Sequence, residues 1–147
     1  MKRKSLEGNA CPVARSLDVI GDCWSLLIVR SAITGTRRFT QFQTELGIAK
    51  NILTIRLKAL VAHNILVPAA ASDGSAYKEY VLTRKGKDLF PVLVALRQWG
   101  EVHLFEGSAP GLRLVEKKTG HLVPLTRIRS SEGRALRPED TQLMKIK

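Results

Sequence analysis

The residues best suited to recognise a ligand lie on one face of the segment 49–63. At 100° per residue, four apolar side chains of this segment form a stripe: Leu53, Leu57, Leu60 and Val61. The opposite face is short, polar and cationic, with one apolar member: Asn51, Thr54, Ile55 and Lys58. An Asn can pair with adenine and an Ile can contact a thymine methyl group, although an Ile here could equally touch a neighbouring helix. The pattern predicts a helix that reads nucleobase edges.

Further polar side chains could hold a phosphate backbone around this face. Four are arginines and lysines that flank the stripe or precede a short helix expected at 41–46: Arg37, Arg38, Lys50 and Arg56. Thr40 is a suitable N-cap for the short helix, and it joins Gln41 among the expected DNA contacts. Lys78 is the cation near an expected hairpin turn. For each cation, a solvated surface charge is the alternative interpretation.

The overall charge favours a polyanionic partner. The chain of 147 residues has 24 Lys and Arg against 13 Asp and Glu, a formal charge of +11. Each Lys or Arg placed on a phosphate releases condensed counterions, which favours binding to nucleic acid. A basic protein whose charge only maintains solubility is the alternative.

The elements that must position these residues follow one another in a recognisable order. Helices are expected over 12–20 and from residue 24 to about 35, followed by the short helix, a turn at Gly47 and the helix 49–63. Strands at 65–67 and 80–82 flank a turn at 72–75, and Thr83 caps a last helix in which Pro91 lies near the start. This order predicts a mostly α, α+β fold, a winged helix-turn-helix.

The chain divides into three parts on composition. Residues 1–9 are polar and are expected to be flexible, and residues 10–106 hold the winged helix-turn-helix and its long C-terminal helix. Residues 107–147 are basic and are interrupted by Gly and Pro, which suggests a β-hairpin followed by a flexible end.

Five separated segments resemble the HxlR-type bacterial transcription regulators, which are relatives of the MarR-like winged helix proteins. They are residues 11–15, 20–24, 37–39, 47–60 and 79–86, and they occur in the order typical of that family. The resemblance implies a homodimeric, sequence-specific DNA-binding regulator that often responds to a small molecule or an electrophile. It places the recognition helix at 49–58 and the preceding helix at 39–46. We expect a repressor, with an architectural or RNA-binding protein as the alternative.

The last helix has more apolar residues than a small wing can cover. With one histidine, they form the expected dimer interface: Leu89, Val92, Leu93, Leu96, Trp99 and His103. A two-fold axis there would set two recognition helices on half-sites about one DNA turn apart, which predicts a palindromic operator. An intrachain core is the alternative.

Cys11 is a candidate sensor of oxidants or electrophiles. It precedes Pro12 at a helix start, where backbone N–H groups favour a thiolate, and Arg15 lies one turn further on. The resemblance also implies sensing at this position, whereas an inert thiol is the alternative. Cys23, inside a helix beside Trp24, is expected to be structural or at the dimer interface.

Several classes of protein are not expected. The chain has no apolar run of about 18 residues and no secretory signal, so we expect a cytoplasmic protein without a membrane partner. Two cysteines do not make a zinc site, and no metal or cofactor is expected. The three histidines lie in separate segments, and the sequence shows neither paired carboxylates nor a Gly-rich phosphate-binding loop. These observations argue against an enzyme.

Overall fold

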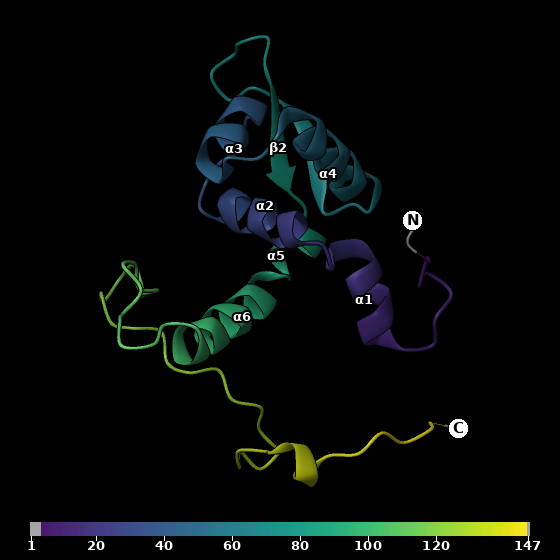
Figure 1. The fold of residues 1–147 in the computed structure, drawn as a ribbon, viewed down its shortest axis with the longest axis vertical. Coiled ribbons are helices and arrows are strands. Elements are labelled where there is room, and N and C mark those ends of the chain that lie inside the picture. Colours follow the sequence, from purple (N-terminus) through teal and green to yellow (C-terminus); the bar gives the residue numbers. More distant parts are fainter. Residues whose placement is uncertain (1–3, 147) are drawn as a thin grey trace. The chain divides into compact units, whose positions relative to one another are not determined.

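A computed structural model describes residues 4–146 (Figure 1). The chain forms two compact units, Met1–Leu93 and Val94–Lys147, and the boundary falls inside the last long helix. The elements are α1 (Pro12–Ile20), α2 (Cys23–Ile33), α3 (Phe39–Leu46), α4 (Lys50–Ala62), β1 (Leu66–Ala70), β2 (Lys78–Leu82), α5 (Arg84–Lys87), α6 (Phe90–His103) and a short 3-10 helix, η1 (Pro138–Asp140). The winged helix-turn-helix order expected from the sequence is confirmed.

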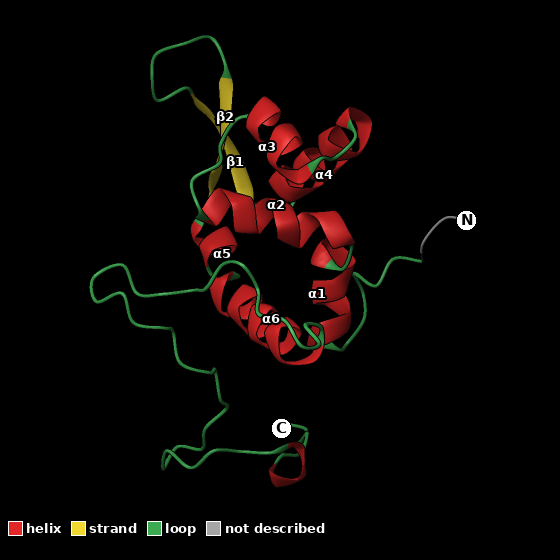
Figure 2. Ribbon diagram, turned by 60° about the vertical axis from the view of Figure 1, so that its left-hand side comes forward, coloured by secondary structure: helices red, strands yellow, loops and turns green. Residues whose placement is uncertain are grey.

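Helices α2, α3 and α4 pack around one apolar core in the first unit, with the two strands beside them (Figure 2). Leu53, Leu57 and Leu60 of α4 are at most 1% exposed, and Val61 packs against the same core while half-buried. The expected apolar stripe is therefore the inner face of α4. The other fully buried members come mainly from α2, α3 and the segment before β1: Ile28, Val29, Phe42, Ile65 and Leu66.

Side-chain caps decide where several helices begin. Asp22 caps α2 by accepting hydrogen bonds from the N–H groups of Trp24 and Ser25, each at 2.9 Å. Thr83 caps α5 as expected, with its hydroxyl accepting from the N–H of Gly86 at 3.1 Å. The expectation that Thr40 caps the short helix is wrong, because α3 begins at Phe39 and the N-cap is Arg38.

The turn between α3 and α4 is made by Gly47. Its φ of 62° lies in the left-handed region, where a residue with a side chain is strained. This turn ends α3 at Leu46, and α4 begins at Lys50, three residues after Gly47. The two helices thereby form the expected helix-turn-helix pair.

Strands β1 and β2 form an antiparallel wing. They pair from Leu66 opposite Leu82 to Ala70 opposite Lys78, so the strands extend further into the turn than the segments expected from sequence. The last helix expected from the sequence is two helices, α5 and α6, separated at residues 88–89. Pro91 is the second residue of α6, a position that does not require its missing N–H.

The second unit is organised by Gln98 of α6. Its amide group donates a hydrogen bond to the carbonyl of Pro124 at 3.0 Å and accepts one from the N–H of Thr126 at 2.7 Å. The expected β-hairpin is reduced to isolated bridges, Val115 with Leu122 and Arg129 with Ala135. Among the described residues, no helix has the length and apolar content needed to span a membrane.

Candidate nucleic-acid interface

The outer face of α4 presents the side chains that the sequence nominated. Asn51 and Lys58 are exposed, and Ile55 is 56% exposed, so Ile55 is not buried against a neighbouring helix of this chain. Thr54 is half-buried, and its hydroxyl donates a hydrogen bond to the carbonyl oxygen of Lys50 at 2.8 Å. That hydroxyl oxygen can still accept a hydrogen bond from a ligand. The face is therefore a row of three polar side chains and one isoleucine, of which all but Thr54 are exposed.

Arg56 lies beside this row and is paired within the chain. Its Nε atom is 3.2 Å from Oδ1 of Asp22, the residue that caps α2. Burial raises the pKa of Asp22, but hydrogen bonds from Ser25 and Trp24, together with the charge of Arg56, outweigh it and leave the pKa below its ordinary value. The pair joins the start of α2 to α4, so Arg56 helps to position the helix that carries the row.

Arg37 and Arg38 connect the turn before α3 to the wing. Glu79 of β2, only 4% exposed, lies 3.6 Å from Arg37 and 3.8 Å from Arg38. Arg38 also pairs with Asp73 in the wing turn and lies over the Tyr77 ring, 5.3 Å from its centre. The hydrogen bonds that Asp73 accepts, from Ser75 and then from Arg38, hold its pKa well below the ordinary range.

Gln41 has a structural contact that the sequence did not suggest. Its side-chain oxygen accepts hydrogen bonds from the N–H groups of Arg38 at 3.0 Å and Arg37 at 3.3 Å. These bonds satisfy backbone donors at the start of α3. The side chain is still exposed, as is that of Thr40, so both lie on the surface near the arginines.

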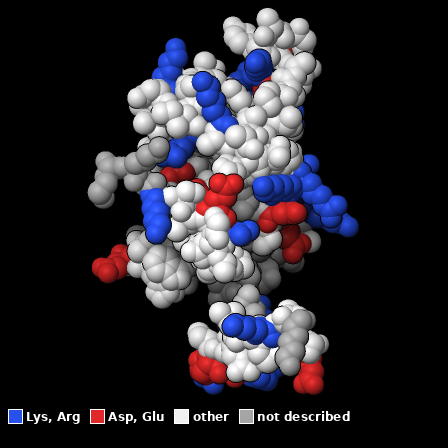
Figure 3. All heavy atoms as spheres, turned by 90° about the vertical axis from the view of Figure 1, so that its right-hand side faces the viewer, with Lys and Arg blue, Asp and Glu red and all other residues white. Residues whose placement is uncertain are grey.

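All three nominated lysines are exposed and form no ion pair with any residue from 4 to 146: Lys50, Lys58 and Lys78. Figure 3 shows the face on which α4 lies, with Lys and Arg side chains projecting from its upper part. Cations without an acidic partner are the ones whose full charge is available to a phosphate. The structure thus separates the nominated cations into exposed lysines and arginines that already contact acidic side chains.

The acidic partners Asp22, Asp73 and Glu79 were missed by sequence reasoning. Asp22 directly precedes an apolar helix, a recognised capping signal that could have identified its role in α2. Glu79 lies about 40 residues after the arginines it contacts, so no local pattern connects them.

The nominated interface residues of α6 fall into two groups. Leu89 and Leu93 pack against the core of the first unit, which supports the intrachain alternative for these two. The others are exposed, with Val92 at 42%, Leu96 at 49% and Trp99 at 58%. His103 is exposed, and its ring centre lies 5.2 Å from that of Trp99. Exposed apolar side chains of α1 and α6 outside the nominated set include Val13 and Leu17 on α1 and Phe90 and Val102 on α6.

Both cysteines are exposed free thiols. Cys11 is the N-cap of α1, and its N–H donates to Oδ1 of Asn9 at 2.8 Å. Arg15 donates instead to the carbonyl of Asn9. Cys23 is the first residue of α2 and is not buried in its interior. Within the described part of the chain, no group of three His, Cys, Asp or Glu side chains could hold a metal ion.

The pattern of the HxlR-like helix-turn-helix family matches residues 19–107. Rv3095 of Mycobacterium tuberculosis, an uncharacterised HTH-type transcriptional regulator, is 39% identical over 102 residues, and the match spans 69% of this chain and 65% of that protein. The chain therefore matches slightly less than two thirds of the length of this relative.

Solved structures show the same architecture. The crystal structure of PA1607, a candidate transcription factor, has a TM-score of 0.92 and 50% identity, covering 96% of this chain and 99% of that one. The oxidised form of the redox regulator HypR has a TM-score of 0.58 and 33% identity, covering 63% of this chain and 97% of that one.

Proposed function

This chain belongs to the HxlR-like helix-turn-helix family, and from that premise we propose that it is a homodimeric transcriptional repressor that binds a palindromic DNA operator. The observation that carries the proposal is the solvent-open row on α4, because a recognition helix needs short polar side chains that can approach base edges. Its relatives are named as transcriptional regulators and not as enzymes.

The proposed roles divide between reading bases and holding the backbone. Asn51 and Thr54 read base edges, and Ile55, with more than half its surface exposed, contacts a thymine methyl group. Lys50 and Lys58 contact phosphates, since both are exposed cations beside the row. The arginines already held by acidic side chains contribute mainly by fixing α4 and the wing in position.

Dimerisation would supply the second half-site. Val92, Leu96 and Trp99 are exposed apolar side chains of one helix, and pairing with a second copy would remove them from water. A two-fold related pair of α4 helices would then face half-sites about one DNA turn apart. A repressor bound across such a site would exclude polymerase from the promoter.

Sensing is proposed at Cys11. Its thiol is exposed at the N-cap of α1, and the similarity to the redox regulator HypR supports a sensing role for a thiol in this chain. Oxidation or alkylation of this thiol would change the affinity of the dimer for its operator.

Operator selection from random duplex DNA at fixed salt tests the proposal, followed by a comparison of two variants. Asn51→Ala should cost about 1–3 kcal/mol and relax one operator position, whereas Lys50→Ala should weaken every sequence alike and lower the salt slope by about 1. Equal losses for both variants on every sequence would contradict the division of roles. Failure of the intact protein to distinguish a palindrome from random DNA would favour a non-specific nucleic-acid binder instead.

A further inference from the structure

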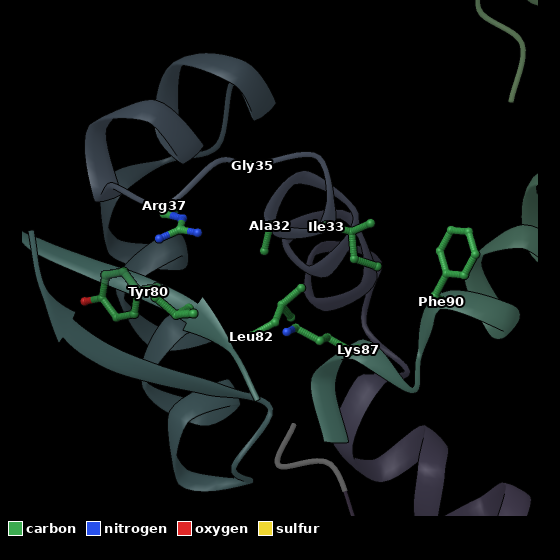
Figure 4. Close-up of a pocket in the computed structure, with 9 residues that line it drawn as sticks. Ala32, Ile33, Gly35, Arg37, Tyr80, Leu82, Lys87 and Phe90 are labelled. Carbon is green, nitrogen blue, oxygen red and sulfur yellow. The ribbon is translucent and has the colours of Figure 1, made fainter. Parts of the chain in front are cut away.

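The first unit contains a pocket of about 560 Å³ that the DNA-binding role does not use. It lies between the end of α2, strand β2, α5 and the first residue of α6 (Figure 4). Its main lining side chains are Ile33, Arg37, Tyr80, Leu82, Lys87 and Phe90. Pockets that bind small molecules usually have volumes of about 300–1,000 Å³ and combine apolar walls with a few polar groups.

The charge of the lining is one-sided. Arg37 and Lys87 are both cationic, and none of the described residues that line the pocket is acidic. Arg37 lies 3.6 Å from Glu79, a contact that leaves most of its five N–H donors available. Lys87 has no acidic partner within residues 4–146. The pocket therefore offers two cationic donors to an anion.

The rest of the lining is apolar or aromatic. Ile33 and Leu82 are half-buried, and the rings of Tyr80 and Phe90 lie on opposite sides of these two residues in Figure 4. An inorganic anion would leave these walls uncovered, whereas an organic acid would cover them with its hydrocarbon part. We propose that the pocket binds a small aromatic carboxylate, whose carboxylate group is held by Arg37 and Lys87 and whose ring lies against Ile33, Leu82 and Phe90.

Binding of the carboxylate in this pocket would change the affinity of the protein for DNA. This consequence rests on the proposed function. The N–H of Tyr80 donates to the carbonyl of Arg37 at 2.7 Å, so the wing strand and the turn before α3 are joined at one wall of the pocket. A carboxylate bound to Arg37 would compete with Glu79 for that arginine, and so would act on the contact between the turn before α3 and the wing. A ligand that binds the DNA-free protein better must lower operator affinity by the same factor.

The site is tested by following the amide NMR signals of the ¹⁵N-labelled full-length protein during titration with benzoate, phenylacetate and indole-3-acetate. Phenylacetamide, the uncharged analogue of phenylacetate, is the control ligand. At least one acid should give saturable amide shifts centred on Gly35, Val81 and Leu82, which line or adjoin the pocket. Phenylacetamide should bind about tenfold more weakly than phenylacetate, the factor for losing one charged hydrogen bond.

Lys87→Gln should weaken carboxylate binding by about tenfold. Arg84→Gln is the matched control: it removes one charge from the same helix at an exposed position outside the pocket, and it should change binding less than about twofold. Equal binding of acid and amide, equal effects of the two variants, or no saturable shift with any of the three acids would each overturn the proposal.

A separate measurement of operator binding keeps the two proposals distinct. If the protein binds its operator but none of the acids, the pocket proposal fails and the regulator proposal stands. If the acids bind at the pocket but no operator can be selected, the regulator proposal fails and the ligand site stands. An acid that fills the pocket without changing operator affinity would overturn the coupling alone.

Discussion

Replacing Asp22 tests how α2 and α4 are held together. Asp22→Ala removes the cap of α2, which is worth about 1 kcal/mol. It also leaves the hydroxyl of Ser25 without its hydrogen-bond acceptor. Because Ser25 is only 1% exposed, we expect this to cost about 1 kcal/mol more of stability. It also removes the ion pair with Arg56, whose side chain is 35% exposed and therefore partly screened, for about 0.5 kcal/mol. We expect a loss of about 2–3 kcal/mol in the free energy of unfolding.

Asp22→Asn is the matched control. An asparagine oxygen can still accept from the N–H groups of Trp24 and Ser25, so the cap remains while the charge is lost. The expected loss is about 0.5–1 kcal/mol. Urea unfolding followed by circular dichroism measures both variants, at one fixed protein concentration because dimerisation would add to the apparent stability.

The Asp22 carboxylate also makes the free energy of unfolding depend on pH. Because the pKa of Asp22 in the folded protein is below its ordinary value of 3.8, its charge stabilises the fold fully above that value. This contribution is lost as the pH falls through the lower, folded pKa. The difference in free energy of unfolding between the intact protein and Asp22→Asn should therefore be present at pH 7 and shrink below about pH 4. Equal losses for Asn and Ala, or a pH-independent difference, would refute the reasoning.

Three further changes test other parts of the molecule. Gly86→Ala should cost about 1–3 kcal/mol in urea unfolding, because a Cβ there would lie 2.3 Å from the carbonyl oxygen of Ile65, whereas Gly8→Ala, in open space, should cost less than about 0.5. Trp99→Ala should weaken the dimer by about 30-fold in analytical ultracentrifugation, and an unchanged dissociation constant would remove this face from the interface. Cys11→Ser should bind the operator normally yet lose its response to N-ethylmaleimide, whereas Cys23→Ser should respond like the intact protein; a persistent response in Cys11→Ser would exclude that thiol.

The helix that carries the proposed recognition row was predictable because its information is local. A period of 3.6 residues separates Leu53, Leu57 and Leu60 from Asn51 and Ile55, and the structure buries the first set and exposes the second. Thr83 and the Gly47 turn were predictable for a similar reason, since capping and left-handed turns depend on one or two residues.

The start of α3 was not predictable in this way. Thr40 has the right side chain for a cap, but the chain uses the Gln41 side chain to accept from the backbone before Phe39, which moves the helix start. Local propensity allowed both arrangements, and the hydrogen bonds of the Gln41 side chain were not expected from the sequence. The same applies to Leu89 and Leu93, which were nominated for an interface and pack against the chain's own core.

The sequence by itself determined the order of helices, the wing and the two faces of α4, since each depends on neighbours within a few turns. Only the tertiary structure decided what the cations do. It places Asp22 beside Arg56, and Glu79 beside Arg37 and Arg38, across 34 to 42 positions of chain, while Lys50 and Lys58 stay open to solvent. Ion pairs of this kind depend on distance in space, which no periodicity along the chain records.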